Sequence, residues 1–239
     1  MGKITIGILA LQGAFAEHQT ALQRLSIPGR KVSVVQVRTP EDLASCDALV
    51  IPGGESTTIA LLARLSGLLE PLREFLARKP VWGTCAGAIL LSQKVENAKK
   101  GGQELLGGMS ISIARNGWGS QVESFEAQLE VSGLKEPERS FTGVFIRAPV
   151  LLSLNTSPND PPITVIARLP PSILPQLVAE QTALVKQDGQ EVKEDARQVV
   201  AIRQGLHFLT TFHPELTSDD RFHEYFIREC VVPQLKAGT

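Results

Sequence analysis

The sequence predicts an α/β fold: a single three-layer domain with a mostly parallel central sheet, helices on both faces and an antiparallel extension of the sheet. In the first half, short apolar runs alternate with stretches of helical periodicity, which is typical of βαβ units and a parallel sheet. The second half has several strand-like runs with few helical stretches between them. The chain of 239 residues is long enough for one such domain.

Periodicity places the elements of the first half in order. Strands are expected over residues 3–11, 31–37 and 47–51, and helices over 14–25 and 68–78. Glu17 and His18 fall early on the first of these helices, where we expect them on a solvated face without a chemical role.

The second half is predicted to add antiparallel strands to the sheet. The strand-like runs are residues 109–114, 124–131, 141–146 and 163–167. A hairpin around Gln204-Gly205 and a last helix from about 219 to 235 follow. Segments near 153–162 and 168–197 are rich in Pro, Asp, Glu and Gln, and we expect them to be surface insertions in one domain of residues 1–239.

Composition excludes several classes of function. The net charge is −1 with no basic block, which argues against a nucleic-acid partner or an anionic membrane surface. No apolar stretch reaches transmembrane length, and the N-terminal run lacks the features of a signal peptide. Three widely spaced cysteines argue against a disulfide framework and a zinc site. We therefore expect a cytoplasmic enzyme without a bound metal.

The stretch from Val81 to Leu91 carries the first candidate catalytic residue. An apolar strand end leads into the start of a helix, and Cys85 stands between them with Gly83 and Gly87 two residues away on each side. This pattern is a nucleophile elbow with cysteine in place of serine. The N–H groups of a helix N-terminus favour the thiolate and can receive an oxyanion. The alternative is a buried structural cysteine in a turn rich in small residues.

A glycine-rich loop follows the third predicted strand. Residues 52–58 read Pro-Gly-Gly-Glu-Ser-Thr-Thr and precede a helical stretch from Ile59, with Ser56 or Thr57 as the expected N-cap. Ligands of open α/β sheets bind beyond the carboxyl ends of the strands, so this loop is expected near Cys85. On its own, the loop fits a plain strand-to-helix turn equally well.

A cysteine nucleophile needs a histidine, and the histidine needs an orienting group. His213 follows an apolar strand, and Glu215 lies just beyond a proline that prevents a helix from starting at the histidine. This spacing lets the carboxylate reach the far ring nitrogen. We expect His207 and His223 on a strand surface and a helix surface.

Three motifs now occur in one order along the chain: Pro52-Gly53-Gly54, Gly83-Thr84-Cys85-Ala86-Gly87 and His213-Pro214-Glu215. They resemble those of the class I glutamine amidotransferases. Additional stretches resemble the glutaminase subunits of pyridoxal 5′-phosphate synthases: LQGA at 11–14, PGGESTT at 52–58, EPLREF at 70–75, TGVFIRAP at 142–149 and FHPELT at 212–217. The resemblance runs from residue 4 to about residue 232, and the two insertions are longer than we expect for compact members of the family.

The resemblance implies that L-glutamine is hydrolysed to glutamate and ammonia through a γ-glutamyl thioester on Cys85. His213, oriented by Glu215, would transfer protons, and the N–H groups of Gly54 and Ala86 would hold the oxyanion. The residues that would contact substrate are Gly53, Gly54, Glu55, Ser56, Ala86, Arg115, Ile146 and Arg147. It further implies a partner synthase that uses the ammonia to make pyridoxal 5′-phosphate (vitamin B6), and no cofactor in the glutaminase itself.

Three alternatives remain at this stage. One is a glutaminase of the same class that serves another synthase, such as that of the histidine pathway. Another is a cysteine peptidase or γ-glutamyl hydrolase on a related sheet. The third is a binding module without activity, which the presence of all three candidate catalytic residues disfavours.

Overall fold

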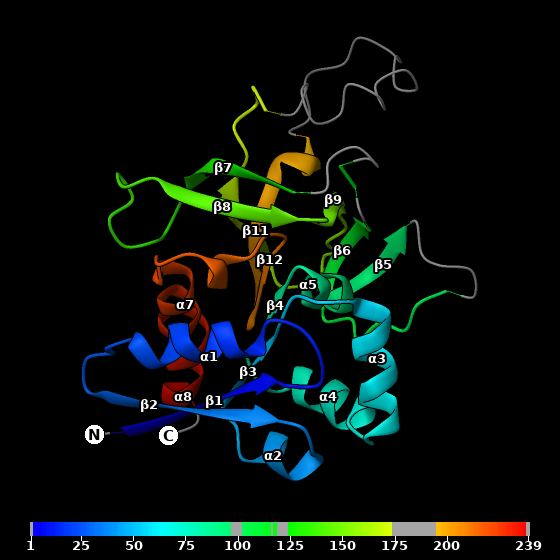
Figure 1. Ribbon diagram of the computed structural model, residues 1–239, viewed down its shortest axis with the longest axis vertical. Coiled ribbons are helices and arrows are strands. Elements are labelled where there is room, and N and C mark those ends of the chain that lie inside the picture. Colours follow the sequence, from blue (N-terminus) through cyan, green and yellow to red (C-terminus); the bar gives the residue numbers. More distant parts are fainter. Residues whose placement is uncertain (1, 97–101, 116, 119–123, 174–194, 238–239) are drawn as a thin grey trace.

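A nine-stranded mixed sheet runs through the molecule (Figure 1). The computed structural model describes residues 2–96, 102–115, 117–118, 124–173 and 195–237. Five neighbouring strands are parallel, in the order β2 (Arg30–Val37), β1 (Gly2–Leu9), β3 (Ala48–Ile51), β4 (Val81–Thr84) and β12 (His207–Thr210). Four antiparallel strands continue the sheet: β11 (Val199–Gln204), β10 (Ile163–Arg168), β7 (Ser124–Val131) and β8 (Phe141–Ile146). The predicted parallel half and its antiparallel extension are confirmed.

Strands β3, β4 and β12 are buried on both faces because a helical layer covers each face. Successive side chains of a strand point to opposite faces. In β3, Ala48 and Val50 therefore join one core cluster, while Leu49 and Ile51 join the other. This double burial explains why β3 and β4 read as short continuous apolar runs.

Two groups of helices provide the buried partners. The cluster that contains Trp82 also takes residues of α1 (Phe15–Arg24), α7 (Arg221–Tyr225) and the π-helical segment Phe226–Val231, which leads into α8 (Val232–Ala237). The opposite cluster takes residues of α2 (Pro40–Ala44), α3 (Ser56–Leu65), α4 (Leu69–Leu76) and α5 (Ala86–Leu91). Figure 1 shows α1 and α7 on one side of the sheet and α3 and α4 on the other. The three-layer prediction is confirmed.

A second, three-stranded sheet stands beside the first and was not predicted as such. It consists of β5 (Ser92–Glu96), β6 (Met109–Ala114) and β9 (Val150–Leu154). Only β6 was expected as a strand, and it was expected in the main sheet. The sequence of β5, Ser-Gln-Lys-Val-Glu, has one large apolar residue and gives no strand signal. Strand β9 includes Ser153 and Leu154, which were assigned to a surface insertion.

The rest of the first insertion, from Asn155 to Pro162, is largely exposed, as expected, although Asp160 accepts a hydrogen bond from Ser110 Oγ. Of the second insertion, residues 174–194 lie outside the described residues. Arg168 ends β10, and Ala196–Gln198 forms a short 3₁₀ turn before β11. Within the described ranges, no helix has the length and apolarity needed to cross a membrane.

Candidate active site

Cys85 occupies a strained turn between β4 and α5. Its φ of 46° and ψ of −99° lie outside the regions that side chains normally allow. The turn depends on its flanking glycines. A Cβ on Gly83 would lie 2.5 Å from the carbonyl oxygen of Gly87, and one on Gly87 would lie closer than 3.0 Å to the carbonyl oxygen of Ile51. The expectation of close backbone approach at both glycines is confirmed.

The sheet brings Cys85 and His213 together because β4 and β12 are parallel neighbours. Thr84 pairs with Thr210 in the register, and the Cys85 N–H donates to the Thr210 carbonyl at 2.9 Å. His213 follows β12 by three residues and donates its N–H to the carbonyl of Val144 on β8 at 2.8 Å. Both side chains thus lie at the carboxyl ends of adjacent strands, where ligands bind in this class of fold.

Glu215 is buried and faces the ring of His213. Its Oε1 lies 2.7 Å from His213 Nδ1. The intervening Pro214 starts a 3₁₀ turn, which folds the carboxylate back onto the ring. With Nδ1 occupied, the chemistry of the imidazole is left to Nε2.

The charges in this cluster support one another. Burial alone would lower the pKa of His213, but hydrogen bonds and charges from Cys85 and Glu215 raise that pKa to about 10. Burial would raise the pKa of Glu215, but electrostatic interaction with the His18 and His213 rings and the hydrogen bond with His213 hold it below its ordinary value. The raised pKa of His213 and the lowered pKa of Glu215 therefore favour an imidazolium beside an ionised carboxylate at neutral pH.

The loop after β3 packs against the loop after β1. A Cβ on Gly53 would lie less than 3.0 Å from the His213 ring, so only glycine fits there. The Gly53 carbonyl accepts from the Ala14 N–H at 3.0 Å, and the Glu55 N–H donates to Gln12 Oε1 at 2.8 Å. The side chain of Gln12, to which the sequence assigned no role, therefore braces the glycine loop beside the histidine.

The predicted N-cap of α3 is wrong. The helix begins at Ser56, and the cap is Glu55, whose carboxylate accepts the Thr58 N–H at 2.8 Å. Glutamate can replace the shorter capping residues here because Thr57 and Thr58 hydroxyls also donate to the same oxygen. Gly54, just before the cap, is exposed, and Ser56 is buried.

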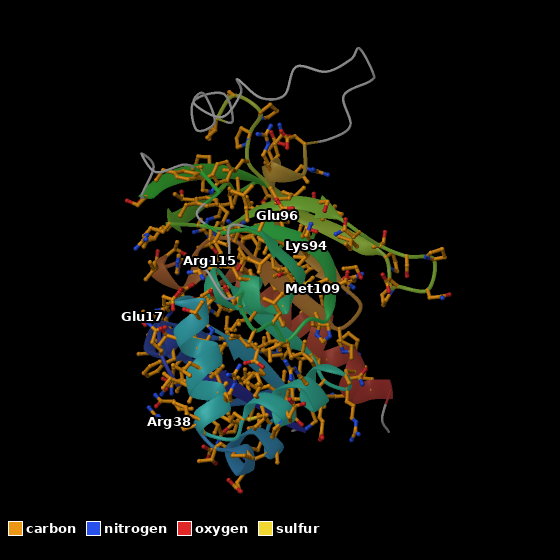
Figure 2. All side chains as sticks on the ribbon, turned by 90° about the vertical axis from the view of Figure 1, so that its right-hand side faces the viewer. Glu17, Arg38, Lys94, Glu96, Met109 and Arg115 are labelled. Atoms are coloured by element: carbon orange, nitrogen blue, oxygen red, sulfur yellow. The ribbon has the colours of Figure 1, made fainter. Side chains whose placement is uncertain are left out.

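Arg115 approaches this loop from the end of β6 (Figure 2). Its Nη2 donates to Glu55 Oε1 at 2.7 Å, and its Nη1 donates to Gln103 Oε1 at 3.0 Å. Arg115 and Glu55 are therefore joined in an ion pair, where the sequence suggested carboxylate recognition.

The other expected substrate residues border Cys85. Ala86 is the first residue of α5 and is buried. The carbonyl of Ile146 lies 3.9 Å from the Cys85 sulfur, while the Ile146 side chain is 41% exposed. Arg147 is exposed and has a φ of 45°. The structure thus gathers the glycine loop, α5 and the end of β8 around one thiol.

Three histidines were misplaced by the sequence reasoning, which put them on surfaces. His18 and His223 are completely buried, and His207 is 9% exposed. His18 Nε2 lies 3.4 Å from Glu215 Oε2. A signal was present: His18 precedes Leu22 by four residues, so both lie on the same, inward face of α1.

Comparison with known proteins places the chain in a family. The model of the SNO glutamine amidotransferase family matches residues 8–174 and 173–232. A probable pyridoxal 5′-phosphate synthase subunit PDX2 from Arabidopsis thaliana is 42% identical over 229 residues, covering 94% of this chain and 85% of that protein. The pyridoxal 5′-phosphate synthase subunit PdxT of a Roseiflexus species is 44% identical over 226 residues, covering 94% and 99%.

A crystal structure of a glutamine amidotransferase superposes with a TM-score of 0.71 at 39% identity, covering 93% of this chain and 97% of that one. The fold, the family model and the sequence relatives agree. The chain belongs to the SNO glutamine amidotransferase family.

Proposed function

We propose that this glutamine amidotransferase hydrolyses L-glutamine with a triad of Cys85, His213 and Glu215. The observation that carries the proposal is the meeting of a cysteine on a strained elbow with a histidine whose Nδ1 is held by a buried carboxylate. This arrangement supports the roles of nucleophile for Cys85, base for His213 and orienting group for Glu215, which covalent catalysis requires.

The chemistry follows from these positions. The Cys85 thiolate attacks the side-chain amide carbon of glutamine, and the resulting oxyanion is held by the N–H groups of Gly54 and Ala86. His213 gives its proton to the departing nitrogen, so ammonia leaves and a γ-glutamyl thioester remains. His213 then takes a proton from water, the hydroxide attacks the thioester, and glutamate leaves as the thiolate re-forms. Each assisted proton transfer contributes roughly 10²–10⁴-fold in rate.

Substrate is held around the thiol. The contacting residues are Gly53, Gly54, Glu55, Ser56, Ala86, Arg115, Ile146 and Arg147. The guanidinium of Arg115 suits the α-carboxylate because it offers several donors in one plane. Its position beside Glu55 near the glycine loop supports this role.

The product ammonia is passed to the synthase subunit of a pyridoxal 5′-phosphate synthase, with which this chain forms a hetero-oligomer. The names of the relatives from Arabidopsis and Roseiflexus support this partner. Free ammonia is protonated and lost in water, so a glutaminase of this kind is useful only when it is docked on an acceptor enzyme.

We place the enzyme in the cytoplasm and treat residues 1–239 as one domain. Three buried, free thiols support a reducing compartment. Strands from the beginning, middle and end of the chain share the nine-stranded sheet, which supports a single folding unit.

The decisive experiment measures ammonia release from glutamine with and without the synthase subunit. Cys85→Ala is expected to lower kcat by roughly 10⁴-fold or more, because the nucleophile is removed. Cys46→Ala is the matched control, since Cys46 is also buried but precedes β3, at the opposite end of that strand from the glycine loop. Ammonia release that survives in Cys85→Ala, or hydrolysis of γ-glutamyl peptides with glutamine untouched, would contradict the proposal.

A further inference from the structure

Two histidines that the mechanism does not use lie buried directly behind the triad. His18 comes from α1 and His223 from α7. Both pack against the ring of Trp82 on β4, with ring centroids 5.4 Å and 4.8 Å away. Burying two ionisable side chains side by side costs free energy unless they are satisfied by partners.

Their partners form one continuous line. His18 Nε2 lies 3.1 Å from Thr84 Oγ1 and 3.4 Å from Glu215 Oε2. On the other side of the ring, His18 Nδ1 lies 2.9 Å from His223 Nε2. Because Glu215 Oε1 contacts His213, the line runs from the reacting histidine through the carboxylate to two further imidazoles.

Both imidazoles are neutral at pH 7. Burial lowers the pKa of His18, with Glu215 and Glu17 opposing this effect and His213 adding to it. Burial also places the pKa of His223 well below its ordinary value, and electrostatic interaction with His18 and Arg24 lowers it further. A neutral imidazole has one N–H and one bare nitrogen, so each ring must adopt a definite tautomer.

The neighbouring carboxylate selects the tautomers. If His18 carried its proton on Nδ1, a bare nitrogen would face the Glu215 anion and the ring would have nothing to donate to it. With the proton on Nε2, His18 donates toward Thr84 and Glu215 Oε2, and its bare Nδ1 accepts from the Nε2–H of His223. Within the described residues, Glu215 Oε2 is buried without a hydrogen bond of normal geometry, and His18 Nε2 lies 3.4 Å from it. A proton on Nε2 supplies the donor that this buried anion otherwise lacks, which makes this tautomer the favourable one.

We propose that His18, oriented by His223, is a positioning residue that donates its Nε2–H to Oε2 of Glu215 and so keeps Oε1 on His213. This inference rests on the proposed function, because it assigns Glu215 to the triad. His18 is not among the residues proposed to bind substrate or to supply the nucleophile. It acts through Glu215, whose orientation and ionised form stabilise the imidazolium of His213.

The test compares three substitutions in the complex with the synthase subunit. His18→Leu removes the donor and keeps an apolar side chain of similar size. His18→Gln retains an amide N–H near the position of Nε2. His207→Leu is the control, because His207 is also a buried, neutral histidine, but it contacts Leu76 and Gly108 and is not part of the line. Thermal unfolding establishes that each variant is folded.

Two pH profiles are measured: kcat and KM for glutamine, and the rate of Cys85 alkylation by iodoacetamide, which needs no turnover. In His18→Leu, Glu215 is no longer held in place and its ionised form is less favoured. Glu215 therefore stabilises the thiolate–imidazolium pair less. The alkylation midpoint should therefore move to higher pH, and the basic limb of kcat should move to lower pH. We expect kcat to fall roughly 10- to 100-fold, with KM unchanged. Removing a residue that hydrogen-bonds to a metal-binding side chain, and so orients it, has an effect of this size. His18→Gln should recover most of both losses.

The outcomes separate the two proposals. Wild-type complex that releases no ammonia overturns the proposed function, while the alkylation profiles still decide the role of His18. Profiles in His18→Leu that match those of His207→Leu overturn the positioning role, as does equal loss in the Leu and Gln variants.

A further measurement needs no variant to fold well. The chain has four histidines, so ¹⁵N spectra of histidine-labelled protein resolve each tautomer. We expect Nε2–H forms for His18 and His223 at pH 7. An Nδ1–H form of His18 would overturn the inference.

Discussion

At the scale of single residues, Arg115 forms a structural ion pair and is also proposed to bind the substrate. Its guanidinium donates to Glu55, which also caps α3. Desolvation would raise the pKa of the Glu55 carboxyl, but the hydroxyls of Thr57 and Thr58 and the guanidinium of Arg115 hold it well below its ordinary range. Glu55 is thus a fixed anion that holds Arg115 beside the glycine loop before substrate arrives.

We therefore expect Arg115→Gln to raise KM for glutamine roughly 10- to 100-fold, with a smaller change in kcat. The reason is that a hydrogen bond to a charged group contributes about 1.5–3 kcal/mol, and this one acts on the bound substrate rather than on the reacting atoms. Steady-state kinetics of ammonia release measure both constants. Arg24→Gln is the control, because Arg24 forms a similar ion pair, with Asp220, on the exposed side of α1. A fall in kcat without a change in KM would contradict the assignment.

Some of these residues could be predicted from the sequence, and others could not. Cys85, His213 and Glu215 stand out because each belongs to a short motif whose local geometry is set by glycine or proline. The ion pair of Glu55 with Arg115 joins residues 60 positions apart, and no local pattern reports such a contact. His18 was predicted to lie on a solvated face because histidine is a polar residue. Its position in the helix, four residues before Leu22, instead puts it on the buried face.

At the scale of elements, the elbow requires β4, α5 and β3 to pack backbone against backbone. Gly87 lies in the first turn of α5, directly over the carbonyl of Ile51 at the end of β3. Strand and helix approach this closely only where one of them lacks a side chain. The flanking glycines could be predicted from the pattern alone. Strands β5 and β9 could not, because their pairing with β6 depends on residues distant in the chain.

Gly87→Ala is expected to destabilise the protein by at least about 1–3 kcal/mol, the usual cost of overpacking, because the obstructing atom is backbone and cannot rotate away. It should also lower kcat by displacing Cys85. Urea unfolding and ammonia release measure the two effects. In Gly2→Ala, the atoms nearest to the added Cβ belong to the flexible side chain of Arg30, which can move away, so little change is expected. Equal stabilities of these two variants would refute the close-packing argument.

At the scale of the whole molecule, all four histidines are buried, and their proton affinities are shifted in both directions. Burial lowers the pKa of His18, His207 and His223, whereas the thiol and carboxylate raise that of His213. A lowered histidine pKa gives stability that is complete above pH 6.5 and is lost as the pH falls. A raised histidine pKa gives stability that is complete below pH 6.5 and is lost as the pH rises toward 10. Acid should therefore destabilise the fold through the first group.

His207 allows this to be measured away from the candidate active site. Burial lowers its pKa to about 4, with a backbone hydrogen bond to Leu76 opposing the shift. Between pH 7.5 and 5.0 the unfolded chain gains a proton at this position and the folded chain does not, which removes about 2 kcal/mol of stability. Equilibrium urea unfolding at the two pH values should show a loss in His207→Leu that is smaller than the wild-type loss by this amount. His213 remains in both proteins, so its opposite contribution cancels in the comparison. Equal losses in the two proteins would mean that His207 accepts a proton in the folded state as readily as in the unfolded chain.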